Sequence, residues 1–134
     1  MRPFPLKIVT PDGIDFEGQA ESLTLRTTSG DLGILAGHIN LVAPLGQGRC
    51  TIVIDGKRRY AACIGGMVSV MDGIVTLIPT TCEWAENIDA ARVEKSYDKA
   101  QRILSDKDSS KTDIALAEAR LKRALVRRSV ASIK

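Results

Sequence analysis

The apolar positions of this chain repeat with one period in its first part and with another in its last part. In the first part, short apolar runs are separated by Asp-Gly pairs at positions 12–13, 55–56 and 72–73. A two-residue hairpin turn of type I′ needs positive φ at both central positions, and Asp-Gly pairs adopt it readily. We therefore predict that each pair joins two antiparallel strands.

The strands predicted from these runs are residues 6–9, 22–26, 51–54, 59–64, 67–71 and 74–78. Pro79 is predicted to end the last strand, because proline has no N–H to donate to a sheet. Gly65 and Gly66 fall between two runs and indicate a bend or a bulge. Short strands at regular spacing with Asp-Gly turns favour a β-sandwich or a barrel.

Residues 27–45 combine Gly30, Gly33 and Gly37 with the only histidine, His38. Glycine is useful where the backbone takes positive φ or approaches another group closely. We predict an irregular loop of defined shape over this segment. Because a metal or catalytic site needs further ligands or partners, a structural or interface role is favoured for His38.

The last part of the chain has helical spacing and contains neither Gly nor Pro from residue 87 onward, which permits long helices. Asn87 or Asp89 is suited to cap the first helix, and Ser110 with Asp113 resembles a capping box at the start of the second. A short polar break over residues 105–112 predicts an antiparallel hairpin of two helices, each about 25 Å long. The apolar stripes comprise residues 90, 93, 97, 100 and 104, followed by 114, 117, 121 and 124.

This pattern predicts two domains, a β-domain over residues 1–86 and a helical hairpin over residues 87–134. The helical stripes are narrow and rich in alanine, so the hairpin buries little apolar area by itself. We expect it to need a second surface, either its own β-domain or a partner. An element with two docking surfaces is suited to act as a switch.

Composition and cysteine content exclude several classes of protein. No apolar run approaches the roughly 18–20 residues that span a bilayer, and neither a secretory nor a transit segment is present, so a cytosolic chain is expected. Nucleophile-elbow, phosphate-loop and dinucleotide motifs are absent, and no metal site is predicted. Cys50, Cys63 and Cys82 form no Cys-x-x-Cys pair and are expected to be reduced.

The net charge of +3 hides an uneven distribution, since residues 87–134 carry 12 Lys and Arg against 7 Asp and Glu. Arg120, Arg123 and Arg127 share one face of the predicted second helix, and Lys122 lies among them. Such a stripe suits either a solvated helix end or contact with an acidic protein surface or phosphates. An aromatic content of 4% counts against a nucleic-acid-binding module, so no nucleic acid is expected as a partner.

Four segments, residues 6–13, 30–38, 65–70 and 85–92, resemble the epsilon subunit of F-type ATP synthases in order and spacing. The chain departs from the family pattern at Ala36 and Asn40, where the family has proline, and at residues 78–80. Asp31 stands where an acidic residue, more often glutamate, follows the first loop glycine. The resemblance implies an N-terminal antiparallel β-sandwich followed by a C-terminal antiparallel two-helix hairpin.

The same resemblance implies a non-catalytic subunit of the central stalk, peripheral to the cytoplasmic face of a bacterial membrane. The sandwich would bind the gamma subunit, and its end carrying Asp31 and His38 would face the ring of c subunits. The hairpin would fold on the sandwich or extend toward the alpha and beta subunits of the catalytic head and restrain ATP hydrolysis. The basic residues Arg120, Lys122, Arg123 and Arg127 would then meet acidic surfaces of that head.

Some members of the family bind ATP as a regulatory ligand at the start of the hairpin. Ile88, Asp89 and Arg92 match that motif here, with Val93 in place of its final alanine. The resemblance implies that Glu83, with Lys122 or Arg123, would complete the site. No other cofactor is implied.

Two other functions stay open at this point. A β-domain adaptor would use the hairpin to bind another protein partner, without effect on any ATPase. A nucleic-acid-binding module would show a steep dependence of affinity on salt.

Overall fold

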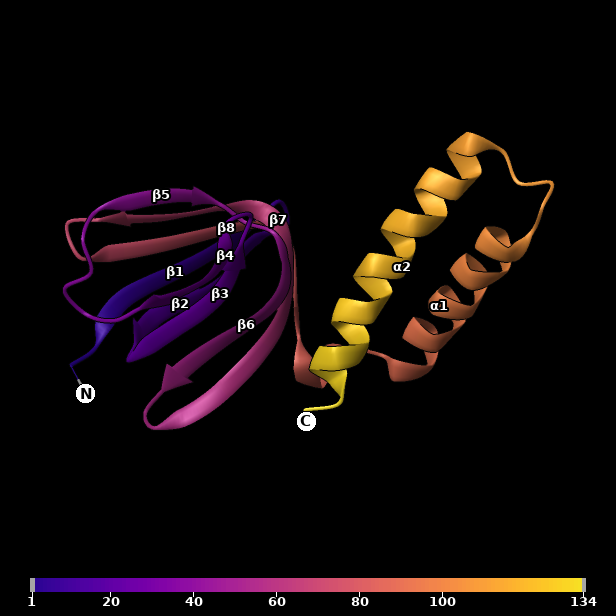
Figure 1. Cartoon of the computed structure of the whole chain (residues 1–134). Helices are drawn as coiled ribbons and strands as arrows, with labels where there is room; N and C mark the ends of the chain where they lie inside the picture. The colour runs from indigo at the N-terminus through magenta and orange to yellow at the C-terminus, as the bar shows by residue number, and fades with distance from the viewer. Residues whose placement is uncertain (1, 134) are drawn as a thin grey trace. The chain divides into compact units, whose positions relative to one another are not determined.

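The computed structural model describes residues 2–133, which form two compact units that divide between Trp84 and Ala85 (Figure 1). The first unit is built of strands and the second of helices. The predicted fold class, a β-domain followed by two helices, is confirmed.

The first unit is one hydrogen-bonded ladder in the order β2-β1-β8-β7-β6-β3-β4, with β5 paired to β7. All neighbouring pairs are antiparallel except β1 and β8, which run parallel. The strands are β1 (Phe4–Thr10), β2 (Gly13–Ala20), β3 (Ser22–Thr27), β4 (Gly30–Ile34), β5 (Leu41–Pro44), β6 (Gln47–Ile54), β7 (Lys57–Met71) and β8 (Ile74–Trp84).

The ladder folds over on itself, because strands far apart in its order touch one another. β2 contacts β6, although β1, β8 and β7 lie between them in the ladder. Alternate residues of the strands are buried, and their side chains point inward from the two layers of the folded ladder into a single apolar core. This core includes Leu6, Ile8, Leu23, Leu25, Ile52, Val68, Val70, Val75 and Leu77.

Two of the three predicted type I′ turns are confirmed. Asp55 and Gly56 have φ of 51° and 76°, and Asp72 and Gly73 have φ of 50° and 82°. The turn between β1 and β2 differs, since its central residues are Pro11 and Asp12, and only Gly13 takes a positive φ. Proline fixes φ near −65°, so a type I′ turn is impossible there.

β7 is one long strand, not the two predicted, and it bends at Gly65 and Gly66. It pairs with β6 before the bend and with β5 after it. Both glycines take positive φ, and a Cβ on Gly66 would collide with the carbonyl oxygen of Ile78 in the adjacent β8. The bend therefore requires glycine at this position.

The prediction that Pro79 ends the last strand is wrong, because β8 continues to Trp84. Pro79 stands opposite Gly66 at the bend, and the pairing of β8 with β1 extends only to Leu77. Proline is tolerated where its missing N–H faces no neighbouring strand.

The segment 27–45 is more regular than predicted. It contains β4 and β5, and only residues 35–40 between them are irregular. Gly30 and Gly33 lie in β4, which pairs antiparallel with β3. The sequence favoured a loop because glycine is normally poor in strands, whereas here Gly30 closes the β3–β4 turn with φ of 124°.

The second unit consists of η1 (Ala85–Asn87), α1 (Ala90–Ser105) and α2 (Lys111–Ala131). Asp89 caps α1, and Ser110 caps α2 by accepting a 3.1 Å hydrogen bond from the N–H of Asp113. The two helices pack side by side as the predicted hairpin, and α2 also contacts η1. At 1.5 Å per residue, α1 is about 24 Å long, as expected, but α2 is about 32 Å long.

Candidate functional site on the hairpin and the sheet

The seam between α1 and α2 is built of small residues. Val93 and Ala100 of α1 and Ala117 and Ala124 of α2 are buried, whereas Ala90, which was assigned to the stripe, is exposed. The larger members of the stripe are only half-buried. Because alanine buries little area, side-chain polar contacts contribute a larger share of the interaction between these helices.

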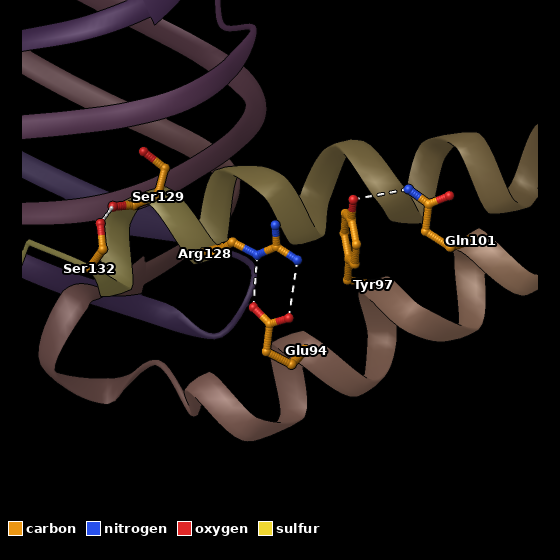
Figure 2. A network of polar contacts seen from close by, with 6 residues as sticks. All are labelled: Glu94, Tyr97, Gln101, Arg128, Ser129 and Ser132. Atoms are coloured by element: carbon orange, nitrogen blue, oxygen red, sulfur yellow. Dashed lines mark hydrogen bonds and ion pairs between the residues drawn. The ribbon is translucent and has the colours of Figure 1, made fainter.

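Arg128 of α2 makes the main polar contact across the seam (Figure 2). Its Nε and Nη2 donate to the two carboxylate oxygens of Glu94 in α1, at 2.8 and 3.1 Å. Its guanidinium also lies over the ring of Tyr97, 3.9 Å from the centroid. The Tyr97 hydroxyl accepts a 2.9 Å hydrogen bond from Gln101. We call this group the Glu94–Arg128–Tyr97 clamp.

The clamp combines a bidentate ion pair with a cation–π contact, both strengthened by the planar guanidinium. Hydrogen bonding to Glu94 raises the pKa of Arg128 above its ordinary value, so the cation persists at any physiological pH. The sequence analysis did not predict the clamp. The available signal was the antiparallel hairpin itself, which brings the start of α1 beside the end of α2.

At the start of α1, the structure brings Ile88, Asp89 and Arg92 together. Asp89 accepts a 3.1 Å hydrogen bond from the backbone N–H of Arg92, and Ile88 is buried. Within residues 2–133, the Arg92 side chain makes no hydrogen bond or ion pair, so it does not pair with the carboxylate of Asp89. Asp89 is therefore a helix cap, and the guanidinium of Arg92 is available to an anion.

The remaining residues of the predicted nucleotide site are on other elements. Glu83 lies in β8 of the first unit, half-buried opposite Ala62. Lys122 and Arg123 lie in the middle of α2, the first exposed and the second half-buried. Successive residues of a helix point about 100° apart, so these two cations face different directions.

The predicted basic stripe is present on α2. Arg120, Arg123 and Arg127 are half-buried at helical spacing, and Lys122 is exposed beside them. Arg128, next to Arg127 on the same helix, is instead engaged by Glu94 in the clamp.

Asp31 and His38, which the resemblance assigns to contact with the c-subunit ring, lie near opposite ends of β4. Asp31 is near the start of β4, where it forms a 3.0 Å ion pair with Arg26 across the β3–β4 turn. His38 follows the other end of β4, in the 35–40 loop, where its Nδ1 is 2.7 Å from the carbonyl oxygen of Ile39. The exposed apolar side chains of Leu35 and Ile39 belong to the same loop.

One further surface was not predicted, and it consists of apolar side chains on the outer face of β5, β7 and β8. Met67 pairs with Ile78, and Met71 with Ile74, so these side chains share one face. Each is between 40% and 54% exposed, and Val42 of β5 beside them is 57% exposed. We call these five residues the β5–β7–β8 apolar face. The signal in the sequence was that residues 67–71 and 74–78 carry apolar side chains on both faces.

The described residues offer no cluster of three or more His, Cys, Asp or Glu side chains able to hold a metal ion. No helix within residues 2–133 is long and apolar enough to cross a membrane.

Comparison with protein families matches both units. Residues 3–85 match the ATP synthase delta/epsilon chain beta-sandwich domain, and residues 86–132 match the ATP synthase delta/epsilon chain long alpha-helix domain. The ATP synthase epsilon chain of Ruminococcus albus is 44% identical over the full length of both chains. That of Bacillus cytotoxicus is 38% identical, again with full coverage of both chains.

Solved structures with the same fold come from mitochondrial ATP synthases. A chain of the Euglena gracilis enzyme, in an assembly of OSCP, F1 and c-ring, has a TM-score of 0.84 at 22% identity. The match covers 98% of this chain and 82% of that one. A chain of the Tetrahymena thermophila central stalk and c-ring has a TM-score of 0.62 at 14% identity, with 95% coverage of both. The chain therefore belongs to the delta/epsilon family of ATP synthase subunits, as a non-catalytic chain of the bacterial epsilon type.

Proposed function

We propose that this chain is a rotor subunit of the central stalk, which couples the catalytic head to the c-subunit ring and restrains ATP hydrolysis. Membership of the epsilon family supports a place in the ATP synthase complex. The complex would lie on the cytoplasmic face of the bacterial cell membrane, with this chain peripheral to it.

The observation that carries the proposal is the β5–β7–β8 apolar face. Contiguous apolar side chains on a monomer surface mark protein interaction sites. The adjacent strands supply a polar margin, where Lys7 of β1 and Glu17 of β2 form a 3.5 Å ion pair. An apolar centre with a polar rim is the anatomy of a stable subunit interface, and we assign it to the gamma subunit.

We assign the contact with the c-subunit ring to the 35–40 loop. Leu35 and Ile39 expose apolar surface there, and His38 lies between them. Asp31 is engaged by Arg26, so a direct ring contact by its carboxylate would require breaking that ion pair.

The hairpin would provide regulation, because its alanine seam holds the two helices together weakly. When the two helices separate, the hairpin would extend toward the catalytic head and slow ATP hydrolysis. Acidic surfaces of the alpha and beta subunits would then be met by the basic residues Arg120, Lys122, Arg123 and Arg127. ATP would favour the closed hairpin, since a ligand shifts an equilibrium only toward the state that it binds better. Arg92, with Lys122 or Arg123, would contact its phosphates, and Ile88, Asp89 and Glu83 would complete the site.

The proposal is tested with an ATP synthase head and gamma subunit that lack the epsilon subunit. The full chain should bind and lower the rate of ATP hydrolysis, whereas a chain ending at Glu86 should bind without lowering it. Binding by both without inhibition would leave a coupling subunit that does not regulate. Failure of the full chain to bind the head of its own organism would instead favour the adaptor function.

A second variant tests the surface on which the proposal rests. Replacing Met71 and Ile74 with lysine should weaken binding at least about tenfold, because the two side chains are a cross-strand pair within the apolar face. Thr24→Lys is the matched control, since Thr24 is exposed on β3, which has no partner among β5, β7 and β8. Equal binding by the double variant and the control would refute the assignment of this face.

A further inference from the structure

The three cysteines come from three neighbouring strands and gather in the first unit. Cys63 of β7 and Cys82 of β8 stand directly opposite each other in the antiparallel pair. Cys50 lies in β6, two residues from Gly48, the residue that pairs with Cys63. The proposed stalk function uses none of these thiols.

The geometry of Cys63 and Cys82 is already close to that of a disulfide. Their Sγ atoms are 3.7 Å apart. Directly opposite residues of antiparallel strands have Cα atoms about 4.5–5.5 Å apart, within the range of roughly 4.4–6.8 Å that disulfides span. Bond formation at about 2.05 Å therefore needs side-chain rotation but no movement of either strand.

The two thiols differ in access. Cys63 is buried, whereas Cys82 is partly exposed, so a small reagent in solution meets Cys82 first. The neighbouring Cys63 thiol, burial and the Asp15 carboxylate of β2 raise the pKa of Cys82. Hydrogen bonding with the Cys50 side chain is the main cause that raises the pKa of Cys63. Cys63 and Cys82 are therefore both protonated thiols at neutral pH.

We propose that Cys63 and Cys82 form a reversible redox modification site that reacts with small disulfides. The Cys82 thiolate attacks one sulfur of the reagent, forms a mixed disulfide and releases one reagent thiolate. The Cys63 thiolate then attacks the Cys82 sulfur and releases the second reagent thiolate. Two protein thiols are oxidised, one reagent disulfide is reduced to two thiols, and the two protons end on the released thiolates.

The resulting bond joins β7 to β8 just before the chain enters the helices. It closes a loop from residue 63 to residue 82, which restricts the unfolded chain and stabilises the folded one. We expect the oxidised protein to unfold at a temperature several degrees higher than the reduced protein, with the shift reversed by dithiothreitol.

The test uses the full-length protein with glutathione disulfide under native conditions. The expected product has lost two hydrogen masses, and peptide mapping places the bond between Cys63 and Cys82. The rate should rise about tenfold per pH unit from pH 7 to 9, because only the thiolate attacks and both pKa values lie above that range.

Single alanine variants keep the result interpretable. Cys63→Ala should stop at a glutathione adduct on Cys82, and Cys50→Ala should oxidise as the parent does. Three outcomes would each overturn the proposal: a stable adduct on Cys82 of the parent, a bond that includes Cys50, or no reaction of the native protein while the urea-unfolded protein oxidises.

Discussion

Substitution of Gly66 with alanine probes the bend that divides β7 between its two partner strands. Gly66 has φ of +98°, and an added Cβ would lie 2.7 Å from Cα of Pro79 and closer still to the carbonyl oxygen of Ile78. Both atoms belong to the backbone of β8, so no side chain can move aside. β7 and β8 would have to separate at the point where the ladder changes direction.

A matched control separates the strain of a positive φ from this collision. Gly73 has φ of +82°, and a Cβ there would meet nothing within 4 Å. Gly73→Ala should therefore lower the free energy of unfolding by about 1–2 kcal/mol, the strain of placing alanine in the left-handed conformation. Gly66→Ala should cost that amount and about 1–3 kcal/mol more, the range found for overpacked sites.

The assay is urea unfolding followed by the fluorescence of Trp84, the chain's single tryptophan, which is buried at the end of β8. With a slope of about 1–3 kcal/mol per molar urea, the additional cost lowers the midpoint of Gly66→Ala by about 1 M relative to Gly73→Ala. Equal midpoints for the two variants would refute the claim that the bend depends on the close approach of β8.

Three further perturbations bear on the hairpin and the thiols. Arg128→Ala should speed amide hydrogen exchange in α1 and α2 by about threefold to tenfold, because both the ion pair and the cation–π contact are lost. The control Glu118→Gln, which also changes the charge of α2, should leave the exchange rates unchanged. Equal changes in exchange rate for the two variants would contradict a role for the clamp. Asp89→Ala should destabilise the start of α1 by about 1 kcal/mol, seen as faster exchange of its first-turn amides only. The neighbouring thiols and burial raise the pKa values of Cys63 and Cys82 in the folded protein, so the reduced protein should lose stability as pH rises above 9, where the thiols of the unfolded chain ionise first. A variant with alanine at both positions should show a smaller loss in urea unfolding.

The parts of the fold that the sequence predicted are those fixed by local chemistry. The turns at 55–56 and 72–73 depend on two adjacent residues, and the cap of α2 depends on Ser110 and Asp113, which are three residues apart. The predictions were wrong at residues whose conformation depends on a strand that is distant in the sequence. Pro79 continues a strand because no partner needs its N–H, and Gly66 bends one strand because β8 passes close behind it.

In the candidate site, too, the features set by local sequence were predicted, and those that depend on distant residues were not. The N-terminal cap of α1 and the spacing of the basic residues on α2 follow from helical geometry alone. The ion pair between Glu94 and Arg128 joins residues 34 positions apart, so it depends on the register of the hairpin, which neither helix encodes by itself. The apolar face likewise depends on the pairing of β5 with the part of β7 that follows the bend, and no local pattern specifies that pairing.

The parallel pairing of β1 with β8 has a consequence for how this protein is made. Leu6, Lys7 and Ile8 pair with residues 75–77, so β1 is synthesised well before its partner strand β8 is available. Until then β1 is held only by its local hairpin with β2, and its other edge stays open to pairing with another chain. Contacts between distant residues form slowly, whereas helical hairpins fold quickly from local contacts. Completion of the sheet unit is therefore expected to limit the rate of folding, with β1 as the strand that most needs protection during synthesis.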